Sequence, residues 1–424
     1  MDKGYSVIGK SVRKKDALDK VLGRARFAAD LSFPGMLYGA VVRSTIAHGY
    51  IKAIHTGEAE KIPGVVGVLT ARDIPGRNAT GIIIKDEPIL VSHKVRRYED
   101  AVALVAAETK EAAYKAAALV RVEYEELEPV FTVERALEED SPKVHGTSNI
   151  LQRKHLERGD TARAFEQCDV VVEHTYKNSP LSHMFIEPEA GAALYENGIV
   201  TVYSSTQNPH FDRGEVAAML NIPSSRVRSV QTVTGGGFGG KLDISIQCHA
   251  ALIAYCCGRP AKMVRSRIES TLVSSKRHPM VIRARTGAAR DGRILAMEAE
   301  IWGDTGAYAS YGPAVITRAM VHCTGPYEIP NVKIDAAFVY TNNPMSGAFR
   351  GFGVPQAAAA HEGQMEAVAK ALGCSSLELR LKNAQKAGSC TATGQILGDS
   401  VGLIECIEKA VEKDRMTRER RKGG

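Results

Sequence analysis

The stretch 226-RVRSVQTVTGGGFGGKLDISIQCHAALIAYCC-257 decides the fold around it, because a strand-like segment, a glycine-rich loop and a helix-like segment follow one another. Five of the six residues from 235 to 240 are glycine. Glycine permits positive φ angles and a close approach of another group to the backbone. The free N–H groups at the start of a following helix favour an anion. The stretch therefore predicts a tight loop that packs against another segment or a ligand.

Two nucleotide-binding patterns match this loop in part. Gly235, Gly237 and Gly240 fit G-x-G-x-x-G, and with Lys241 the loop also fits most of the P-loop pattern. A P-loop needs a hydroxyl residue after the lysine to bind magnesium, and this chain has Leu242 there. No acidic residue closes a following strand at the distance that a dinucleotide-binding fold requires. A nucleotide-binding module and a purely structural loop both remain open interpretations of the loop alone.

Two further stretches carry candidate functional residues. In 341-TNNPMSGAFRGFGVPQ-356, Arg350 stands between two phenylalanines and among glycines. Backbone amides of such a segment reach a ligand, a phenylalanine stacks on a planar group, and the arginine binds an anion. An arginine paired at a domain edge above core phenylalanines is the alternative. In 204-SSTQNPH-210, Gln207 follows an apolar strand and either caps a loop or donates a hydrogen bond into a site.

The remaining pattern predicts an α+β protein with two units. Residues 1–135 form the first unit, the acidic segment 136–155 is the linker candidate, and the second unit covers 156–424. The expected strands are short apolar or alternating runs, at 36–44, 101–109, 121–130, 199–205 and 226–233. The expected helices are 110–120, 211–221, 246–257 and 356–372.

Composition narrows the classes of function. Hydrophobic residues make up 44% and charged residues 24% of the chain, which is typical of a globular protein. The net charge of +7 is dispersed, and we expect the basic tail 413–424 to be a frayed, solvated terminus rather than a nucleic-acid site. No apolar stretch is typical of a signal peptide or a membrane span, so we expect a cytoplasmic location. The eight cysteines and twelve histidines lack metal-ligand spacing, so no metal bound by side chains is expected.

The three stretches together are more specific than any one of them. In order, S-T-Q-N, T-G-G-G-F-G-G-K and A-F-R-G-F-G-x-P-Q resemble the xanthine dehydrogenase and aldehyde oxidase family of molybdenum hydroxylases. Residues 18–51 are similar to the a/b hammerhead domain of that family, and 187-EPEAGAAL-194 is similar to the opening of its first molybdopterin-binding domain. The resemblance implies a hammerhead domain in 1–135 and the first molybdopterin-binding domain in 156–424.

The resemblance also implies roles around a metal. Gln207 would hydrogen-bond an oxygen ligand of molybdenum. The backbone of Gly237, Phe238 and Gly239 would lie over the metal, and Arg350 would stand beside it. Family members hold molybdenum through a pterin dithiolene with oxo, hydroxyl and sulfido or selenido ligands, and not through side chains. Bacterial members usually carry the cytosine dinucleotide form of molybdopterin, which we expect here.

Three positions bear on the substrate by resemblance. Phe352 would stack on a flat ring, and Leu242 replaces a carboxylate that grips the purine in purine-oxidising members. Arg318 aligns with an arginine that meets substrate oxygen. An apolar wall with an arginine favours an N-heteroaromatic acid, best a pyridine carboxylate, so we expect hydroxylation of nicotinate to 6-hydroxynicotinate with oxygen from water. Purine or aldehyde oxidation is the alternative within the family, and the cysteine-bearing loop of carbon monoxide dehydrogenases is absent.

The resemblance finally implies partner chains. The second molybdopterin-binding domain of the family carries a glutamate that acts as general base, and no matching G-x-G-E element occurs in this sequence. We therefore expect a second molybdopterin subunit to supply that base. An FAD subunit and an iron–sulfur subunit with 2Fe–2S clusters are also expected, because no cysteine spacing here holds a cluster. A non-catalytic assembly subunit is the alternative from another class.

Overall fold

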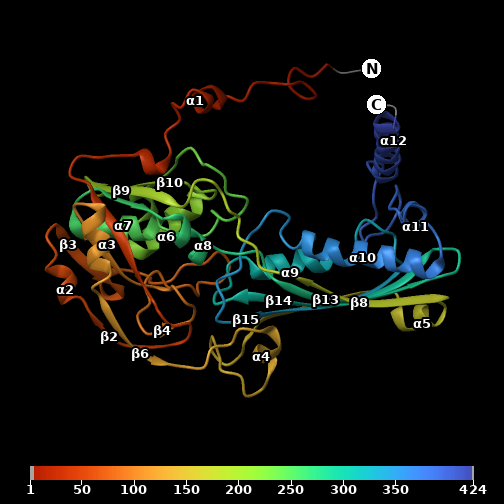
Figure 1. Ribbon diagram of the computed structural model, residues 1–424, viewed down its shortest axis with the longest axis horizontal. Coiled ribbons are helices and arrows are strands. Elements are labelled where there is room, and N and C mark those ends of the chain that lie inside the picture. Colours follow the sequence, from red (N-terminus) through yellow and green to blue (C-terminus); the bar gives the residue numbers. More distant parts are fainter. Residues whose placement is uncertain (1–3, 423–424) are drawn as a thin grey trace.

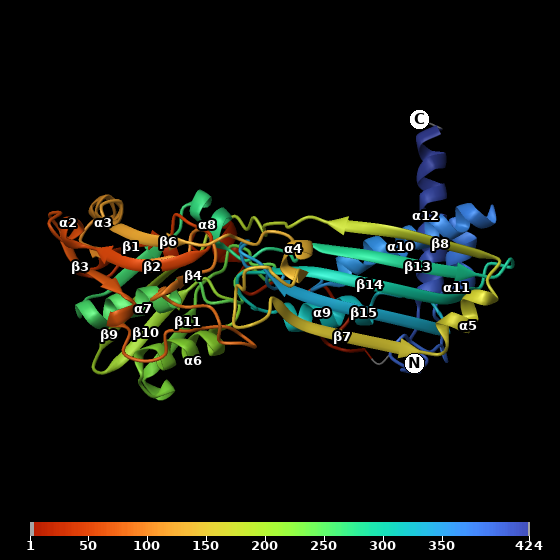
Figure 2. The same ribbon diagram turned by 90° about the horizontal axis from the view of Figure 1, so that it is seen from below.

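The computed structural model describes residues 4–422 and has an elongated body with two lobes (Figures 1 and 2). The first lobe is built on a seven-stranded sheet and the second on a five-stranded sheet. Segments near the two ends, containing α1 (Ala17–Val21) and α12 (Leu403–Lys422), project away from the lobes (Figure 1). The described residues contain no helix with the length and apolar character that crossing a membrane demands.

The seven-stranded sheet joins strands from both units expected from the sequence. In spatial order its strands are β11 (Val227–Gln231), β10 (Ile199–Ser204), β9 (Ala190–Glu196), β12 (Ala261–Val264), β1 (Leu37–Arg43), β5 (Ala101–Ala107) and β3 (Val65–Thr70). The two units are joined where β1 pairs with β12 in parallel, with Leu37 of β1 opposite Ala261 of β12. One hydrophobic core lies beneath both parts, since buried Leu37 and Leu104 belong to the same cluster as Val202 and Leu252.

Helices and a small sheet complete this lobe. A three-stranded sheet contains β4 (Lys94–Val95), β2 (Gly49–His55) and β6 (Arg121–Glu126). The helices of the lobe are α2 (Gly57–Glu60), α3 (Lys110–Ala117), α6 (Pro209–Leu220), α7 (Gln247–Cys257) and α8 (Arg267–Val273). The apolar helix α7 is buried along most of its length and packs on the middle of the large sheet.

The second lobe packs helices on both faces of its sheet. Its strands run in the order β7 (Ile150–Arg158), β15 (Asn331–Tyr340), β14 (Ile294–Gly306), β13 (Met280–Ala288) and β8 (Val170–Asn178). One face is covered by α9 (Gly312–Val321) and α10 (Val354–Leu372), and the other by α4 (Val133–Leu137) and α5 (Thr161–Glu166) (Figure 1). Helix α11 (Ser376–Asn383) follows α10. Pro355 in the first turn and Gly373 with φ 69° after the last turn set the limits of α10.

The α+β class and the expected hammerhead and molybdopterin-binding architecture are confirmed. Every helix and strand expected above overlaps one of the same kind. The linker is shorter in the structure, because α4 and β7 overlap its two ends and only 138–149 lacks helix or strand. The division into domains at 136–155 stays a prediction, and in space the two units share a sheet.

The expectation of a frayed basic tail was wrong for the described part. Residues 413–422 continue α12 as a helix. Ion pairs four residues apart, Glu405 with Lys409 at 2.5 Å and Asp414 with Arg418 at 2.7 Å, support a helix that has little other packing.

Candidate functional site

Two of the glycine-containing stretches meet in space. The glycine-rich loop, residues 234–241, lies between β11 and α7, and the arginine loop, residues 346–353, lies between β15 and α10. The amide of Arg350 donates a hydrogen bond to the Phe238 carbonyl at 2.9 Å. Gly239 has φ 103°, and a Cβ there would lie 2.6 Å from the Ala348 carbonyl oxygen. Only glycine tolerates both conditions, so the sequence of the loop fixes how closely the two loops pack.

Gln207 is attached to the same loop through its side chain. Its Oε1 accepts hydrogen bonds from the amides of Gly239 at 3.0 Å and Lys241 at 3.3 Å. Because only the oxygen of a glutamine amide accepts, these two donors fix the orientation of the group. The side chain is exposed, and its Nε2 has no partner among residues 4–422. The arrangement presents an oriented N–H donor beside Gly237, whose Cβ position lies 2.4 Å from Gln207 Oε1.

Lys241 anchors the glycine-rich loop to the interior of the protein. Its side chain is 1% exposed, and Nζ lies 2.9 Å from Glu187 Oε2, which also accepts from the Gly235 amide at 2.6 Å. Burial lowers the pKa of Lys241, and the hydrogen bond to Glu187 opposes that shift. A P-loop lysine points at a phosphate. This lysine points into the protein, which disfavours the nucleotide-binding interpretation.

The arginine loop is held by its backbone and by Phe349. The Phe349 ring stacks on His183 at 4.1 Å between centroids, and the Arg277 guanidinium lies 3.9 Å from the same ring. His183 Nε2 donates to the Ala348 carbonyl at 2.7 Å, and burial lowers the pKa of this histidine. The side chain of Arg350 is exposed and has no ion pair among the described residues. Its charge is therefore available to a ligand, unlike the paired arginine of the alternative interpretation.

The structure brings two of the expected substrate residues together. The Arg318 guanidinium, exposed on α9, lies 5.9 Å from the centroid of the Phe352 ring. No carboxylate pairs with Arg318 in the described part of the chain. Leu242 stands half-buried directly after the glycine-rich loop, where its amide donates to the Gly239 carbonyl at 3.2 Å.

Tyr311 is a site residue that the sequence analysis missed. It caps the start of α9, and its ring meets the edge of Phe352 with centroids 5.4 Å apart. Burial, followed by the charge of Asp243, raises the pKa of Tyr311 to about 12, so the hydroxyl stays protonated. The Gly-Pro pair after it indicates a helix start, but no motif indicates a site.

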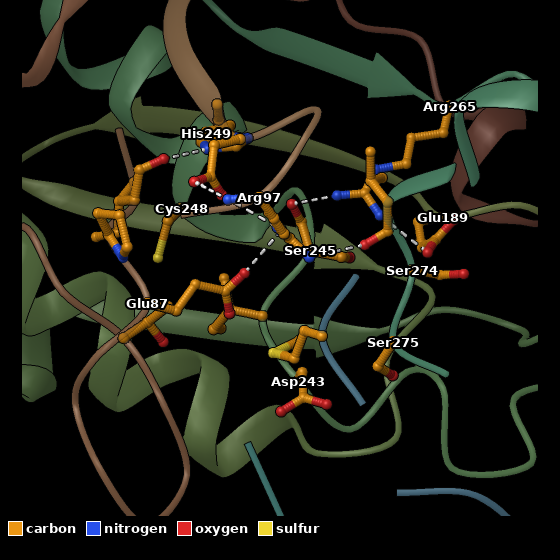
Figure 3. Close-up of a pocket in the computed structure, with 18 of the residues that line it drawn as sticks. Glu87, Arg97, Glu189, Asp243, Ser245, Cys248, His249, Arg265, Ser274 and Ser275 are labelled. Atoms are coloured by element: carbon orange, nitrogen blue, oxygen red, sulfur yellow. Dashed lines mark hydrogen bonds and ion pairs between the residues drawn. The ribbon is translucent and has the colours of Figure 1, made fainter. Parts of the chain in front are cut away.

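A chamber with charged side chains borders the glycine-rich loop, since Gly240 is part of its lining, and Figure 3 shows the charged side chains. Buried Arg97 pairs with Glu87 at 3.1 Å and with Asp100 at 3.0 Å, and Arg265 pairs with Glu189 at 2.9 Å. Burial raises the pKa of Glu87 to about 7. Among residues 4–422 no group of three or more histidine, cysteine, aspartate or glutamate side chains is placed to hold a metal ion. These charged side chains of the chamber form ion pairs with one another.

Family models match both parts of the chain. The model of the aldehyde oxidase and xanthine dehydrogenase a/b hammerhead domain matches residues 22–128. The model of the molybdopterin cofactor-binding domain matches residues 144–384, more than half of the chain.

Similar proteins give the same result. The nicotinate dehydrogenase large molybdopterin subunit of Eubacterium barkeri is 62% identical, over 97% of this chain and 97% of that one. A probable xanthine dehydrogenase subunit of Bacillus subtilis is 43% identical over 90% of this chain, which spans 51% of it. The aldehyde oxidoreductase structure from Desulfovibrio gigas has a TM-score of 0.92 at 32% identity, over 96% of this chain and 46% of that one. The family expected from the three motifs is thus confirmed, and the chain belongs to the aldehyde oxidase and xanthine dehydrogenase family of molybdenum hydroxylases.

Proposed function

We propose that this chain is the molybdopterin-binding subunit of a multi-subunit hydroxylase that converts nicotinate to 6-hydroxynicotinate, with water as the oxygen source. The observation that carries the proposal is the 62% identity to a nicotinate dehydrogenase large subunit along nearly the whole of both chains. Two features of the site support the same substrate class. Leu242 is an apolar residue where purine-oxidising relatives are expected to have a carboxylate, and Arg318 lies beside the Phe352 ring without an acidic partner.

The residues of the site fit a molybdopterin cofactor. Gln207 Nε2 is an oriented, unpartnered donor for an oxygen ligand. The glycine-rich loop leaves its backbone accessible to a flat group, and Phe238, at φ 54°, is 48% exposed beside it. When bound, the molybdenum centre supplies an oxygen atom that derives from water and takes up two electrons. We further propose that the cofactor is the cytosine dinucleotide form with a sulfido or selenido ligand.

The chain's own residues would bind and orient the substrate. Arg318 would pair with the carboxylate of nicotinate, because a guanidinium binds a carboxylate through two parallel hydrogen bonds. Phe352 would stack on the pyridine ring, whose face an aromatic side chain matches. Arg350 would stabilise negative charge that develops during the reaction, since its guanidinium is unpaired and lies at the same loop. The resulting stoichiometry is nicotinate plus water giving 6-hydroxynicotinate, two protons and two electrons.

Partner chains complete this proposal. Gln207, Phe238 and Arg350 are all exposed, so the face that would hold the cofactor has room for another chain. The relative that covers the same length is named a large molybdopterin subunit, which implies at least one further subunit in that enzyme. We propose that a second molybdopterin subunit provides a glutamate as general base, and that FAD and iron–sulfur subunits with 2Fe–2S clusters carry the electrons away.

The test uses the assembled complex, purified through a tag on this chain from its native host. Its molybdenum content is measured first. Nicotinate is then turned over without oxygen, in isotope-labelled water and with an artificial electron acceptor. The expected product is 6-hydroxynicotinate with one labelled oxygen atom. A molybdenum-containing complex that leaves nicotinate unchanged would exclude this substrate, and a metal-free complex with partners attached would favour an assembly subunit.

Xanthine oxidation is the second candidate, supported by the similarity to the Bacillus subtilis protein. The same complex is assayed with xanthine and with an aldehyde. We expect turnover of both to be weak, because Leu242 offers no hydrogen bond to a purine. An unpaired polar group in such a pocket costs about 1–3 kcal/mol. Faster turnover of xanthine than of nicotinate would replace the first proposal by the second.

A further inference from the structure

Three segments of the chain meet at one buried point behind the substrate residues. Asp243 follows the glycine-rich loop, Ser310 precedes α9, and Gly347 opens the arginine loop. Ser310 Oγ donates to Asp243 Oδ1 at 2.9 Å, and both side chains are buried. A Cβ on Gly347 would lie 2.8 Å from Ser310 Oγ and 2.9 Å from Asp243 Oδ2. The hydrogen bond therefore sits where the glycine-rich loop, the arginine loop and α9 are joined.

Ser310 has an unusual backbone that this contact stabilises. Its φ is 41°, in the left-handed region that residues other than glycine seldom adopt. Such a conformation carries a free-energy cost and persists where surrounding contacts enforce it. The next residue is Tyr311, and Arg318 follows two turns further along α9. The turn at Ser310 thus sets the direction in which α9 begins.

We propose that Asp243 and Ser310 are positioning residues for the substrate, because their hydrogen bond holds the start of α9 so that Tyr311 and Arg318 face Phe352. This inference rests on the proposed function of the site. The Tyr311 ring lies 5.4 Å from the Phe352 ring, and the Arg318 guanidinium lies 5.9 Å from it. Both contacts start from α9 or from the residue that caps it. The hydrogen bond between the two positioning residues includes neither Phe352 nor Arg318, so its effect passes through α9.

The other side of Asp243 faces the charged chamber. Its Oδ2 has no partner among residues 4–422, and the side chain stands apart from the ion pairs in Figure 3. The chamber has a volume of about 50 Å³, which admits a few water molecules. Burial raises the pKa of Asp243 to about 6, although the hydrogen bond from Ser310 and the charge of Arg97 oppose that shift. A neutral side chain that still accepts from Ser310 should therefore serve at this position.

The test compares four variants of the assembled complex. Asp243→Ala and Ser310→Ala remove the hydrogen bond, and Asp243→Asn keeps an acceptor for Ser310. Ser275→Ala is the matched control, since its buried hydroxyl lines the same chamber and has no partner. For each variant, KM and kcat for nicotinate and the molybdenum content are measured.

We expect both hydrogen-bond-removing variants to raise KM about tenfold, which corresponds to one lost hydrogen bond, with smaller changes in kcat and unchanged molybdenum. The variant Asp243→Asn should recover most of that loss, and the double alanine variant should be no worse than either single one. Unchanged KM in Ser310→Ala would overturn the inference. So would an equal KM increase in Ser275→Ala, or a loss of molybdenum that accounts for the effect. Failure of the wild-type complex to use any N-heteroaromatic acid would instead reject the proposed function.

Discussion

Arginine side chains are paired with carboxylates in the charged chamber, whereas those on the exposed site face have no such partner among the described residues. In the chamber, Arg97 and Arg265 are buried and each pairs with carboxylates at about 3 Å. On the site face, which we define as Gln207, Phe238, Arg318, Arg350 and Phe352, both arginines are exposed and have no carboxylate partner among the described residues.

We therefore distinguish charged side chains that stabilise the fold from charged side chains that remain available to a ligand. A buried ion is tolerated when it is paired, and removing one partner is then costly. An exposed guanidinium costs little to keep unpaired and remains able to bind an anion. Three of the variants that follow test this separation, in order of decreasing expected effect, and a fourth tests a buried carboxylate that has no cation partner among the described residues.

The largest effect is expected in the chamber. The variant Glu189→Ala leaves Arg265, 9% exposed, without its carboxylate partner. The free energy of unfolding should fall by about 3–5 kcal/mol, as for other broken buried pairs. Chemical unfolding of the complex measures it. The exposed pair of Glu173 and Arg283 is the control, since Glu173→Ala should cost about 0–1 kcal/mol, and equal losses would contradict the comparison.

The next effect concerns catalysis at the site face. The variant Arg350→Met should lower kcat for nicotinate about 10²-fold, as loss of one group that stabilises developing charge usually does. Its free energy of unfolding should change by less than about 0.5 kcal/mol, because the side chain is exposed and unpaired. Steady-state kinetics and unfolding are measured on the same preparation. A stability loss similar to that of Glu189→Ala would place Arg350 among the structural charges.

A smaller effect is expected on substrate binding. The variant Arg318→Met should raise KM for nicotinate by roughly 10- to 100-fold, from a lost hydrogen-bonded charge pair of about 1.5–3 kcal/mol. The KM for nicotinamide should change much less, because the amide carries no charge. Equal changes for both substrates would remove the argument for recognition of the carboxylate.

The fourth variant is expected to gain stability in a way that depends on pH. Asp212 of α6 is fully buried without a cation, and burial raises its pKa from 3.8 to about 7. Between these two values the folded state binds more protons at this group than the unfolded state, so its contribution to stability falls as pH rises and is constant above 7. The variant Asp212→Asn should be more stable than wild type at pH 8, because Asp212 is charged and buried at that pH, whereas asparagine is neutral. At pH 4 the two should match, and an equal difference at both pH values would exclude this origin.

The sequence predicted the local structure around the site well. The glycine-rich loop, the helices on either side of the site and the strand before Gln207 follow from glycine, alanine and apolar patterns that act over a few residues. The resemblance to the family predicted that Gln207, Phe238 and Arg350 lie close together. In the structure, the glycine-rich loop contacts both the arginine loop and Gln207. The roles of these residues around a cofactor stay predictions.

What the sequence did not predict depends on contacts between distant segments. Strand order is one example, since no local pattern indicates that β1 pairs with β12 more than two hundred residues later. The chamber is another, because no local pattern indicates that Arg97 pairs with Glu87, or that Arg265 pairs with Glu189. Tyr311 was missed for the same reason, since its contact with Phe352 forms only in the folded chain.

The parallel join between β1 and β12 limits how this protein is dissected or recombined. A cut between the two family domains would leave each fragment with an open sheet edge and half of a common core. Grafting a hammerhead domain from another family member would need matching residues on β12 and α7 as well. We therefore expect an exchange of segments between relatives to succeed when the whole segment up to the end of β12 is transferred, and we expect shorter segments to fail.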